Sequence, residues 1–199
     1  MKNSSINKYP LSVKQLTTFA MLAALAFVLS FLESLIPFQP GLPGIKLGLA
    51  NLVVVFALFR MDTRAALFIN AVRILLAGFL FSGPFGILYS AAGAAASLAS
   101  MSLLLRINRK RKQAGKSDLF SILGVSMTGG VFHNLGQLFI AILLLSSLNL
   151  VYYFPVMILS GIITGLINGM IAHLLIQALP NCYPPKGHSS CHNILQPSC

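Results

Sequence analysis

Residues 85–112 read FGILYSAAGAAASLASMSLLLRINRKRK, an apolar run that ends in a basic cluster. Residues 85–105 contain no charged side chain, and a helix of about 20 such residues crosses the hydrocarbon core of a bilayer. Lys and Arg are retained on the cytoplasmic side of membranes, so the basic cluster indicates which end faces the cytoplasm. This stretch therefore predicts a transmembrane helix with its C-terminal end inside the cell.

The composition of the whole chain favours lipid as its solvent. Hydrophobic residues make up 56% of the 199 residues and charged residues only 9%, whereas soluble domains average about 25% charged residues. The net charge of +11 would suggest nucleic acid as the partner of a soluble protein, but here the basic residues stand between apolar runs. We expect an all-α protein of the bacterial cell membrane, in contact with membrane lipid, and no nucleic-acid partner.

Apolar runs and basic junctions alternate along the chain. Basic residues precede the first run, follow the second at Arg60 and Arg64, follow the fourth, and follow the sixth at Lys186. The intervening junctions hold only Lys46. By the positive-inside rule, this alternation predicts a polytopic bundle of six transmembrane helices with both termini in the cytoplasm. The six predicted spans are 15–36, 45–59, 65–82, 85–105, 119–148 and 152–179.

Two of these spans have unusual lengths. The second has only about 15 apolar residues, so we expect it to tilt or to be partly re-entrant. The fifth has about 30 residues and would rise about 45 Å, more than one crossing needs. Gly129 and Gly130 lie near its middle, where the sequence leaves open a kink or close packing against a neighbouring helix.

The chain divides into three predicted regions: a cytoplasmic N-terminus at 1–14, a transmembrane domain at 15–180 and a cytoplasmic, disordered tail at 181–199. The tail holds all the cysteines and two histidines in a spacing that matches no closed zinc site. We therefore expect no metal there, and no disulfide in a reducing compartment. These residues are Cys182, Cys191, Cys199, His188 and His192.

Small residues mark the faces where helices touch, because close backbone approach and dispersion hold helices together in lipid. In the sixth span, Gly161, Gly165 and Gly169 recur every four residues and are expected to face another helix of the same chain. In the first span, Ala20 and Ala24 also lie four residues apart. The shallow groove along these two small side chains receives either a partner subunit or a helix of the same chain, and the sequence leaves both alternatives open.

Polar side chains at membrane depth are the candidate site residues, because a polar group in hydrocarbon is costly unless it faces a partner or a hydrated cavity. Most of them fall between the midplane and the outer surface, which predicts a substrate-binding pocket open to the outside. Asn70 and Arg73 share a helix face at a spacing of three residues, and His133 and Gln137 share one at a spacing of four. The candidate residues are Glu33, Lys46, Asn51, Asn70, Arg73, Tyr89, His133, Asn134, Gln137 and Asn168.

Arg73 is the most informative of these residues, because its guanidinium stays charged even when it is buried. Glu33 is the only acidic residue within the predicted spans. If Glu33 pairs with Arg73, the two form a structural ion bridge. If Glu33 pairs with Lys46 instead, Arg73 is free to bind a small anionic or zwitterionic solute.

Residue clusters for catalysis are missing. The chain has three acidic residues, Glu33, Asp62 and Asp118, and they are widely separated, whereas magnesium-dependent synthases hold their metal with clustered aspartates. No GxSxG or HExxH motif occurs either. We therefore expect that this chain is not an enzyme on its own and that it binds no cofactor.

Four stretches carry a resemblance to a known family: PGIKLGLAN at 43–51, Arg73 with Gly78, YSAAG at 89–93 and HNLGQ at 133–137. Together they resemble the Gx transporter family, also named the heptaprenyl diphosphate synthase component I family. That family is similar to the substrate-binding S components of energy-coupling-factor (ECF) transporters, which have six helices and bind small molecules from outside.

The resemblance implies two alternative functions. In ECF transporters, a small-residue motif on the first helix docks a transmembrane coupling subunit and separate ATPases power transport; Ala20 and Ala24 are where that motif maps. The older family name instead implies a noncatalytic membrane component that associates with a soluble heptaprenyl (polyprenyl) diphosphate synthase in menaquinone side-chain formation. The missing aspartate clusters argue against catalysis by this chain, but not against such a supporting role.

Overall fold

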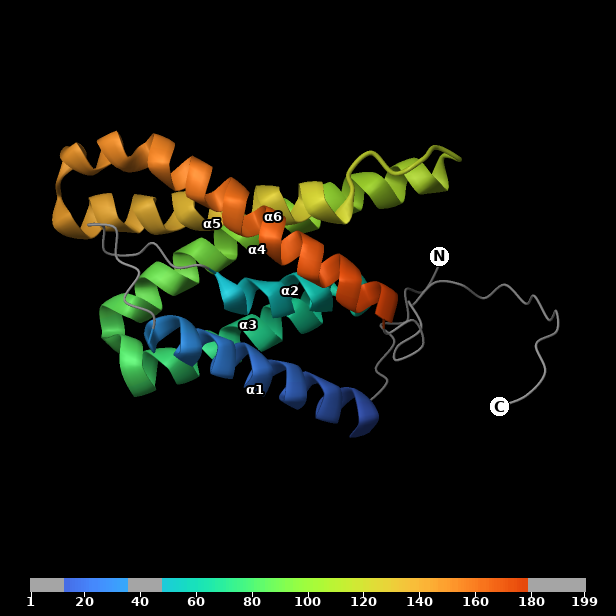
Figure 1. Cartoon of the computed structure of the whole chain (residues 1–199), viewed down its shortest axis with the longest axis horizontal. Coiled ribbons are helices and arrows are strands. Elements are labelled where there is room, and N and C mark those ends of the chain that lie inside the picture. Colours follow the sequence, from blue (N-terminus) through green and yellow to red (C-terminus); the bar gives the residue numbers. More distant parts are fainter. Residues whose placement is uncertain (1–12, 36–47, 179–199) are drawn as a thin grey trace, which may run out of the picture.

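The computed structural model describes residues 13–35 and 48–178, and every regular element in these two ranges is helical. Within these two ranges, six α-helices follow one another (Figure 1). The π-helix η1 (Gly78–Ser82) joins the third to the fourth, and the 3-10 helix η2 (Leu148–Tyr153) precedes the last. The α-helices are α1 (Val13–Leu35), α2 (Leu49–Arg60), α3 (Thr63–Ala77), α4 (Gly83–Gln113), α5 (Ile122–Leu145) and α6 (Phe154–Ala178).

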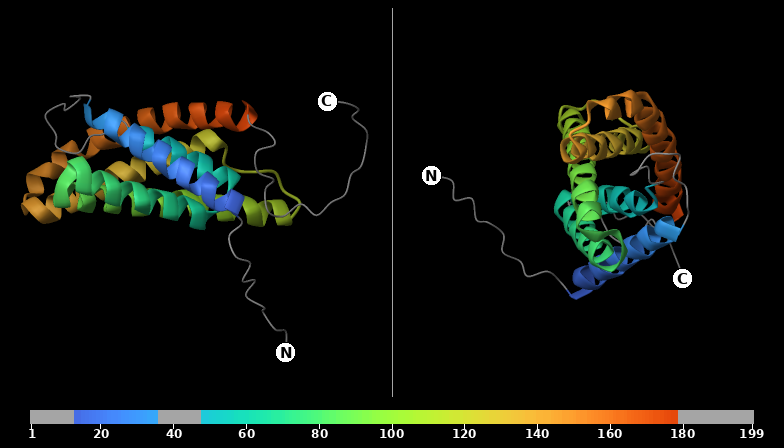
Figure 2. Two further views of the ribbon diagram at one scale, coloured as in Figure 1. Left: turned by 90° about the horizontal axis from the view of Figure 1, so that it is seen from below. Right: turned by 90° about the vertical axis from the view of Figure 1, so that its left-hand side faces the viewer.

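Successive helices run in alternating directions between two ends of the molecule (Figures 1 and 2). α5 packs along both α4 and α6, while α1 packs against α2 and α3. α2 also contacts α6, so this short helix connects the two groups. Its buried side chains Val54, Val55 and Leu58 belong to one apolar core with Ile69 and Met101. The core is therefore built around α2.

Four helical runs among the described residues are long and apolar enough to cross a membrane, judged by length and composition. One of them, Thr63–Gln113, has 51 residues, far more than one crossing needs. Gly83 interrupts this run with φ 68° and ψ 179°, and α3 and α4 run in opposite directions on either side of it. α2 has 12 residues and would rise only about 18 Å. The all-helical prediction is confirmed, whereas six complete crossings stay a prediction because α2 is short.

Large apolar side chains cover much of the outside of the bundle. Phe79, Leu80 and Phe139 are 82%, 67% and 63% exposed. Soluble monomers rarely expose such extended apolar surfaces, because water would have to solvate them. This surface is consistent with helices whose outer faces contact lipid.

The basic segment after the fourth apolar run differs from the sequence prediction. The sequence places the end of the fourth predicted span at residue 105 and the basic residues after it, but α4 continues through Gln113. Lys and Arg are good helix formers, and cations near a helix C-terminus interact favourably with the helix dipole. Gly115, with φ 70°, then ends the helix, and the Lys116 N–H donates to the Arg111 carbonyl at 3.0 Å.

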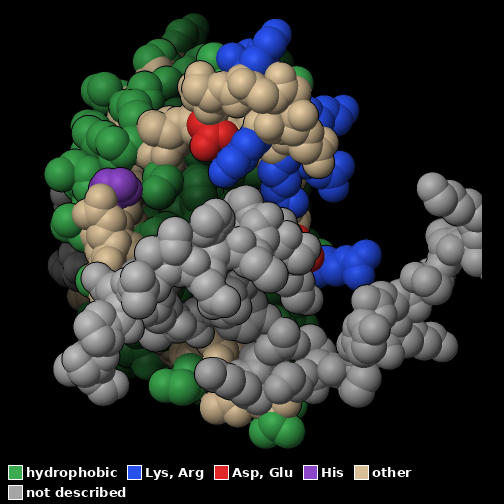
Figure 3. All heavy atoms as spheres, turned by 90° about the vertical axis from the view of Figure 1, so that its right-hand side faces the viewer, with side chains coloured by type: hydrophobic (Ala, Val, Ile, Leu, Met, Phe, Trp, Pro, Cys, Tyr) green, Lys and Arg blue, Asp and Glu red, His purple; other side chains and the backbone are tan. Residues whose placement is uncertain are grey.

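Basic side chains gather at one end of the bundle. Figure 3 views the molecule from the right-hand side of Figure 1 and shows Lys and Arg clustered on that face. α2 and α4 end there and α3 begins there, which brings Arg60 and Arg64 to the end that also holds the basic turns of α4. By the positive-inside rule, we expect this end to face the cytoplasm. Lys46 and the cysteine-containing tail lie outside the described residues.

Glycines let α5 and α6 approach closely. A Cβ atom added to Gly165 would lie 2.6 Å from the Met127 Cα, and one added to Gly130 would collide with the Gly161 carbonyl oxygen. α5 is continuous from Ile122 to Leu145, so the Gly129–Gly130 pair serves close packing and does not break the helix. The prediction that the glycines of the sixth span face a helix of the same chain is confirmed.

We predict that Gly165→Ala lowers the free energy of unfolding by about 1–3 kcal/mol, because its methyl group would overlap backbone atoms of α5. Gly124→Ala is the matched control, since the nearest atom to its new Cβ would be the Ser121 Oγ at 3.7 Å. Thermal unfolding in detergent measures both variants. Helix propensity favours alanine over glycine at both positions, so an equal loss of stability in the two would show that the close contact with α5 does not decide the effect.

Candidate functional site

Arg73 is held by oxygen atoms from two helices. Its Nε and Nη2 donate to the Asn70 Oδ1 at 3.1 and 2.8 Å, and its Nη1 donates to the Ser30 Oγ at 3.2 Å. Asn70 and Ser30 are buried, with 4% and 8% of their surface exposed. The predicted shared face of Asn70 and Arg73 is therefore a direct contact. Ser30 was not among the sequence candidates, because a single serine in an apolar helix carries no distinctive signal.

Glu33 connects this group to the start of α2. Its carboxylate accepts a hydrogen bond from the Gly48 N–H, and it attracts the Arg73 guanidinium electrostatically. A carboxylate at a helix N-terminus is favoured by the helix dipole. Glu33 thus interacts with both Arg73 and the α2 N-terminus. Lys46 is outside the described ranges, so its pairing with Glu33 stays a prediction.

Gly48 also contacts α6, through its backbone carbonyl group. The Asn168 Nδ2 donates to the Gly48 carbonyl oxygen at 2.9 Å, and Asn168 is only 2% exposed. Gly48 adopts the left-handed conformation with φ 70°, which favours glycine. α1, α2, α3 and α6 consequently meet through one polar cluster, which we call the Arg73 cluster: Ser30, Glu33, Gly48, Asn70, Arg73 and Asn168.

His133 and Gln137 lie together on the face of α5 that packs against α4. Their Nε2 atoms are 3.1 Å apart, and a Cβ on Gly93 of α4 would lie 2.9 Å from the Gln137 Cγ. Gln137 is 3% exposed, and its Oε1 has no hydrogen-bond partner within the described part of the chain. An unsatisfied buried acceptor costs about 1–3 kcal/mol. This oxygen is therefore available to a donor from a ligand or a water molecule.

Asn134 lies next to His133 in sequence but faces α6. Its Nδ2 donates to the Met157 carbonyl oxygen at 2.9 Å and to the Ser160 Oγ at 3.0 Å. Asn134 is 2% exposed. Its observed contacts join α5 to α6, so the structure does not bring it together with His133 and Gln137 on one face.

Two more candidates are half-buried. Asn51 lies in the first turn of α2, where its N–H donates to the Gly48 carbonyl oxygen at 2.9 Å. Tyr89 lies one turn before Gly93 on α4, the helix that packs against His133 and Gln137. The structure thus forms one polar cluster at Arg73 and a second polar pair on α5. Gly48 itself was missed as a site residue, although it lies within the PGIKLGLAN stretch.

In a comparison with known protein families, residues 22–175 match the model of the family described as heptaprenyl diphosphate synthase component I. The chain belongs to the heptaprenyl diphosphate synthase component I family. This match confirms the resemblance seen in the sequence motifs. The matched region of this family member includes all the candidate site residues from Glu33 to Asn168. No curated protein shows significant similarity to the chain.

We predict that Asn134→Leu lowers the free energy of unfolding by about 1–2 kcal/mol, because it removes the buried side-chain hydrogen bonds to the Met157 carbonyl oxygen and the Ser160 Oγ. Gln137→Met should cost less, since it removes one hydrogen bond, to the His133 Nε2, together with an oxygen that has no partner among the described residues. Chemical unfolding in detergent measures both. A Gln137→Met loss as large as that of Asn134→Leu would show that the Gln137 Oε1 is bonded within the folded protein.

Proposed function

We propose that this protein is the integral membrane substrate-binding subunit of an ECF-type transporter and captures a small anionic or zwitterionic solute. The observation that carries the proposal is the Arg73 cluster. Arg73 has five N–H donors in total, and its observed hydrogen bonds go to the neutral oxygens of Asn70 and Ser30. A guanidinium with spare donors suits a planar carboxylate or a phosphate.

Acceptors on two different helices favour a zwitterion as well as a simple anion. Glu33 brings negative charge close to Arg73, and Gln137 of α5 brings an amide oxygen that has no hydrogen-bond partner among the described residues. In a solute with an acidic and an amino group, the acidic group would pair with the Arg73 guanidinium, and the amino group would pair with the acceptors Glu33 and Gln137. In this proposal Lys46, Asn51, Tyr89, His133, Asn134 and Asn168 complete the binding residues.

The proposal includes the topology predicted from the sequence. Six crossings would have both termini in the cytoplasm of a bacterial cell membrane and would open the Arg73 cluster to the outside. The alternating helix directions and the basic residues at one end support this topology. Glu33, near the end of α1, and Gly48, at the start of α2, lie toward the opposite end from these basic residues.

The proposed docking site for an ECF coupling subunit is the outer face of α1. Ala20 and Ala24 are exposed on this helix, whereas the neighbouring Ala23 is 5% exposed and packs in the core. A helix of another subunit could approach α1 closely along the two alanines. The coupling subunit and its ATPases would supply the energy for transport.

A second candidate function is a noncatalytic membrane component that associates with a soluble heptaprenyl diphosphate synthase. The description of the matched family favours it. The basic segment from Arg106 to Lys116, which begins in the last turns of α4, would present the contact surface at the cytoplasmic end. Partner identity separates the two candidates, since one requires a membrane coupling subunit with ATPases and the other a soluble synthase.

We predict that native mass spectrometry of the gently extracted protein detects a bound solute, and that Arg73→Gln abolishes its retention. Arg64→Gln is the matched control, because Arg64 is an exposed arginine on the same helix. The control should retain the solute. Retention in the Arg73→Gln variant, or loss in both variants, would contradict the proposed binding site.

We predict that the double variant Ala20→Leu/Ala24→Leu loses the co-purifying coupling subunit, because leucine side chains would hold the partner helix away. Ala95→Leu/Ala99→Leu is the control, since these exposed alanines have the same spacing on α4. Affinity purification followed by mass spectrometry identifies the partners. Capture of a prenyl synthase that is unaffected by either double variant would favour the second candidate function.

A further inference from the structure

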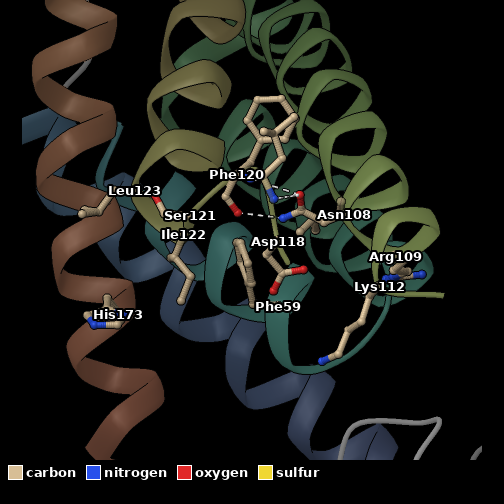
Figure 4. Close-up of a pocket in the computed structure, with 12 residues that line it drawn as sticks. Phe59, Asn108, Arg109, Lys112, Asp118, Phe120, Ser121, Ile122, Leu123 and His173 are labelled. Atoms are coloured by element: carbon tan, nitrogen blue, oxygen red, sulfur yellow. Dashed lines mark hydrogen bonds between the residues drawn. The ribbon is translucent and has the colours of Figure 1, made fainter. Parts of the chain in front are cut away.

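A cleft of about 740 Å³ opens at the basic end of the bundle, away from the Arg73 cluster. Its volume falls in the range of small-molecule sites, about 300–1,000 Å³. Figure 4 shows α4 and α6 on opposite sides of the cleft, with the start of α5 between them. The proposed outer site does not use any of the residues that line it.

The wall of the cleft is apolar and its rim is charged. The apolar part comes from α2, from the last turns of α4, from the loop between α4 and α5 and from the start of α5: Phe59, Leu105, Leu119, Phe120, Ile122 and Leu123. The polar part holds Arg109 and Lys112 from α4, Asp118 from the loop and His173 from α6. An apolar cavity with charges at its edge suits a ligand that has a charged head and a hydrocarbon tail.

The two cations at the rim are available to an outside anion. Arg109 and Lys112 are exposed and lie three residues apart, so they share one face of α4. Within the described part of the chain, neither forms an ion pair with Asp118. The C-terminal end of α4 carries the negative end of its helix dipole. The positive charge of the other basic residues in the same turns is larger than this partial negative charge. The rim therefore attracts negative charge.

The loop that forms one side of the cleft is held in place. The Asn108 Nδ2 donates to the Phe120 carbonyl oxygen at 2.7 Å, and its Oδ1 accepts from the N–H groups of Leu119 and Phe120 at 3.0 and 3.1 Å. Asn108 is 7% exposed. These bonds, drawn in Figure 4, fix Leu119 and Phe120 beside α4. The cleft is thus a preformed feature and not a gap beside a loose loop.

We propose that this cleft binds an amphiphile with a phosphate-bearing head group, held by Arg109 and Lys112, while its hydrocarbon tail lies along the apolar wall. The site is at the level where the head groups of the cytoplasmic leaflet would lie if the basic end faces the cytoplasm. Two sources fit this chemistry: a phospholipid of the bilayer and a free prenyl phosphate. The negative charge of Asp118 would repel a phosphate-bearing head group that has no hydrogen-bond donor to offer the carboxylate.

The test measures binding of four probes to the purified full chain in detergent. Dihexanoylphosphatidylglycerol and farnesyl diphosphate are the amphiphiles, and glycerol phosphate and inorganic diphosphate are their head groups alone. We expect one amphiphile to bind saturably at one site, at least about tenfold tighter than its own head group, because the tail adds apolar burial. Tighter phosphatidylglycerol binding assigns the bilayer as source, and tighter farnesyl diphosphate binding assigns a prenyl phosphate.

Charge-matched variants locate the site. Arg109→Gln/Lys112→Gln should weaken binding of that amphiphile about tenfold or more, because it removes two charge-assisted hydrogen bonds. Arg64→Gln/Lys116→Gln removes the same charge outside the cleft and should change binding less than about twofold. If farnesyl diphosphate is the bound amphiphile, Asp118→Asn should tighten its binding. The apolar wall is tested by Leu119→Glu, at a position 56% exposed, which should abolish binding without unfolding the chain.

Three results would overturn the proposal. The first is no saturable binding of either amphiphile. The second is equal affinity for an amphiphile and its head group, which would mean that no tail enters the cleft. The third is equal loss in the two double variants, which would mean that the basic end attracts anions only as a diffuse charge. If Arg109→Gln/Lys112→Gln fails to fold, the Leu119→Glu result decides alone.

Discussion

The bundle depends on satisfying a permanent positive charge at Arg73 among apolar helices. A guanidinium does not escape this requirement by losing its proton, so oxygen atoms must come to it. They come from Asn70 on its own helix and from Ser30 on α1, while Glu33 adds an opposite charge nearby. The packing of α1 against α3 and the chemistry of the candidate site are consequently two aspects of the same arrangement.

The two halves of the bundle are joined in different ways. Glycines bring α4, α5 and α6 together by close backbone approach, which needs no polar group. α1, α2 and α3 surround an apolar core and the Arg73 cluster instead. α2 connects the halves at both ends, through the Asn168 bond to Gly48 and through the Arg60 Nη2, which donates to the Ile176 carbonyl oxygen at 2.9 Å. A ligand at the Arg73 cluster would therefore touch the region where both halves meet.

Much of this arrangement follows from local sequence patterns, and the remainder depends on contacts between distant segments. Helical spacing alone correctly paired Asn70 with Arg73 and His133 with Gln137, because three and four residues return to the same helix face. Spacing could not reveal that Asn134 faces α6, since that depends on which helix packs on which side. The helical end of α4 was missed because basic residues were interpreted only as a topology signal. Ser30 was missed because its role depends on Arg73, 43 positions away.

Accessibility of the Arg73 cluster from outside the cell is the central claim, and thiol labelling tests it most directly. In a chain whose three native cysteines are replaced by serine, Asn51→Cys would place a thiol one turn from Gly48. A membrane-impermeant maleimide is added to intact cells and, separately, to broken membranes, with Lys116→Cys as the marker for the basic end. We expect Asn51→Cys to react in intact cells and Lys116→Cys only in broken membranes. Reaction of Asn51→Cys in broken membranes alone would contradict a site that opens to the outside.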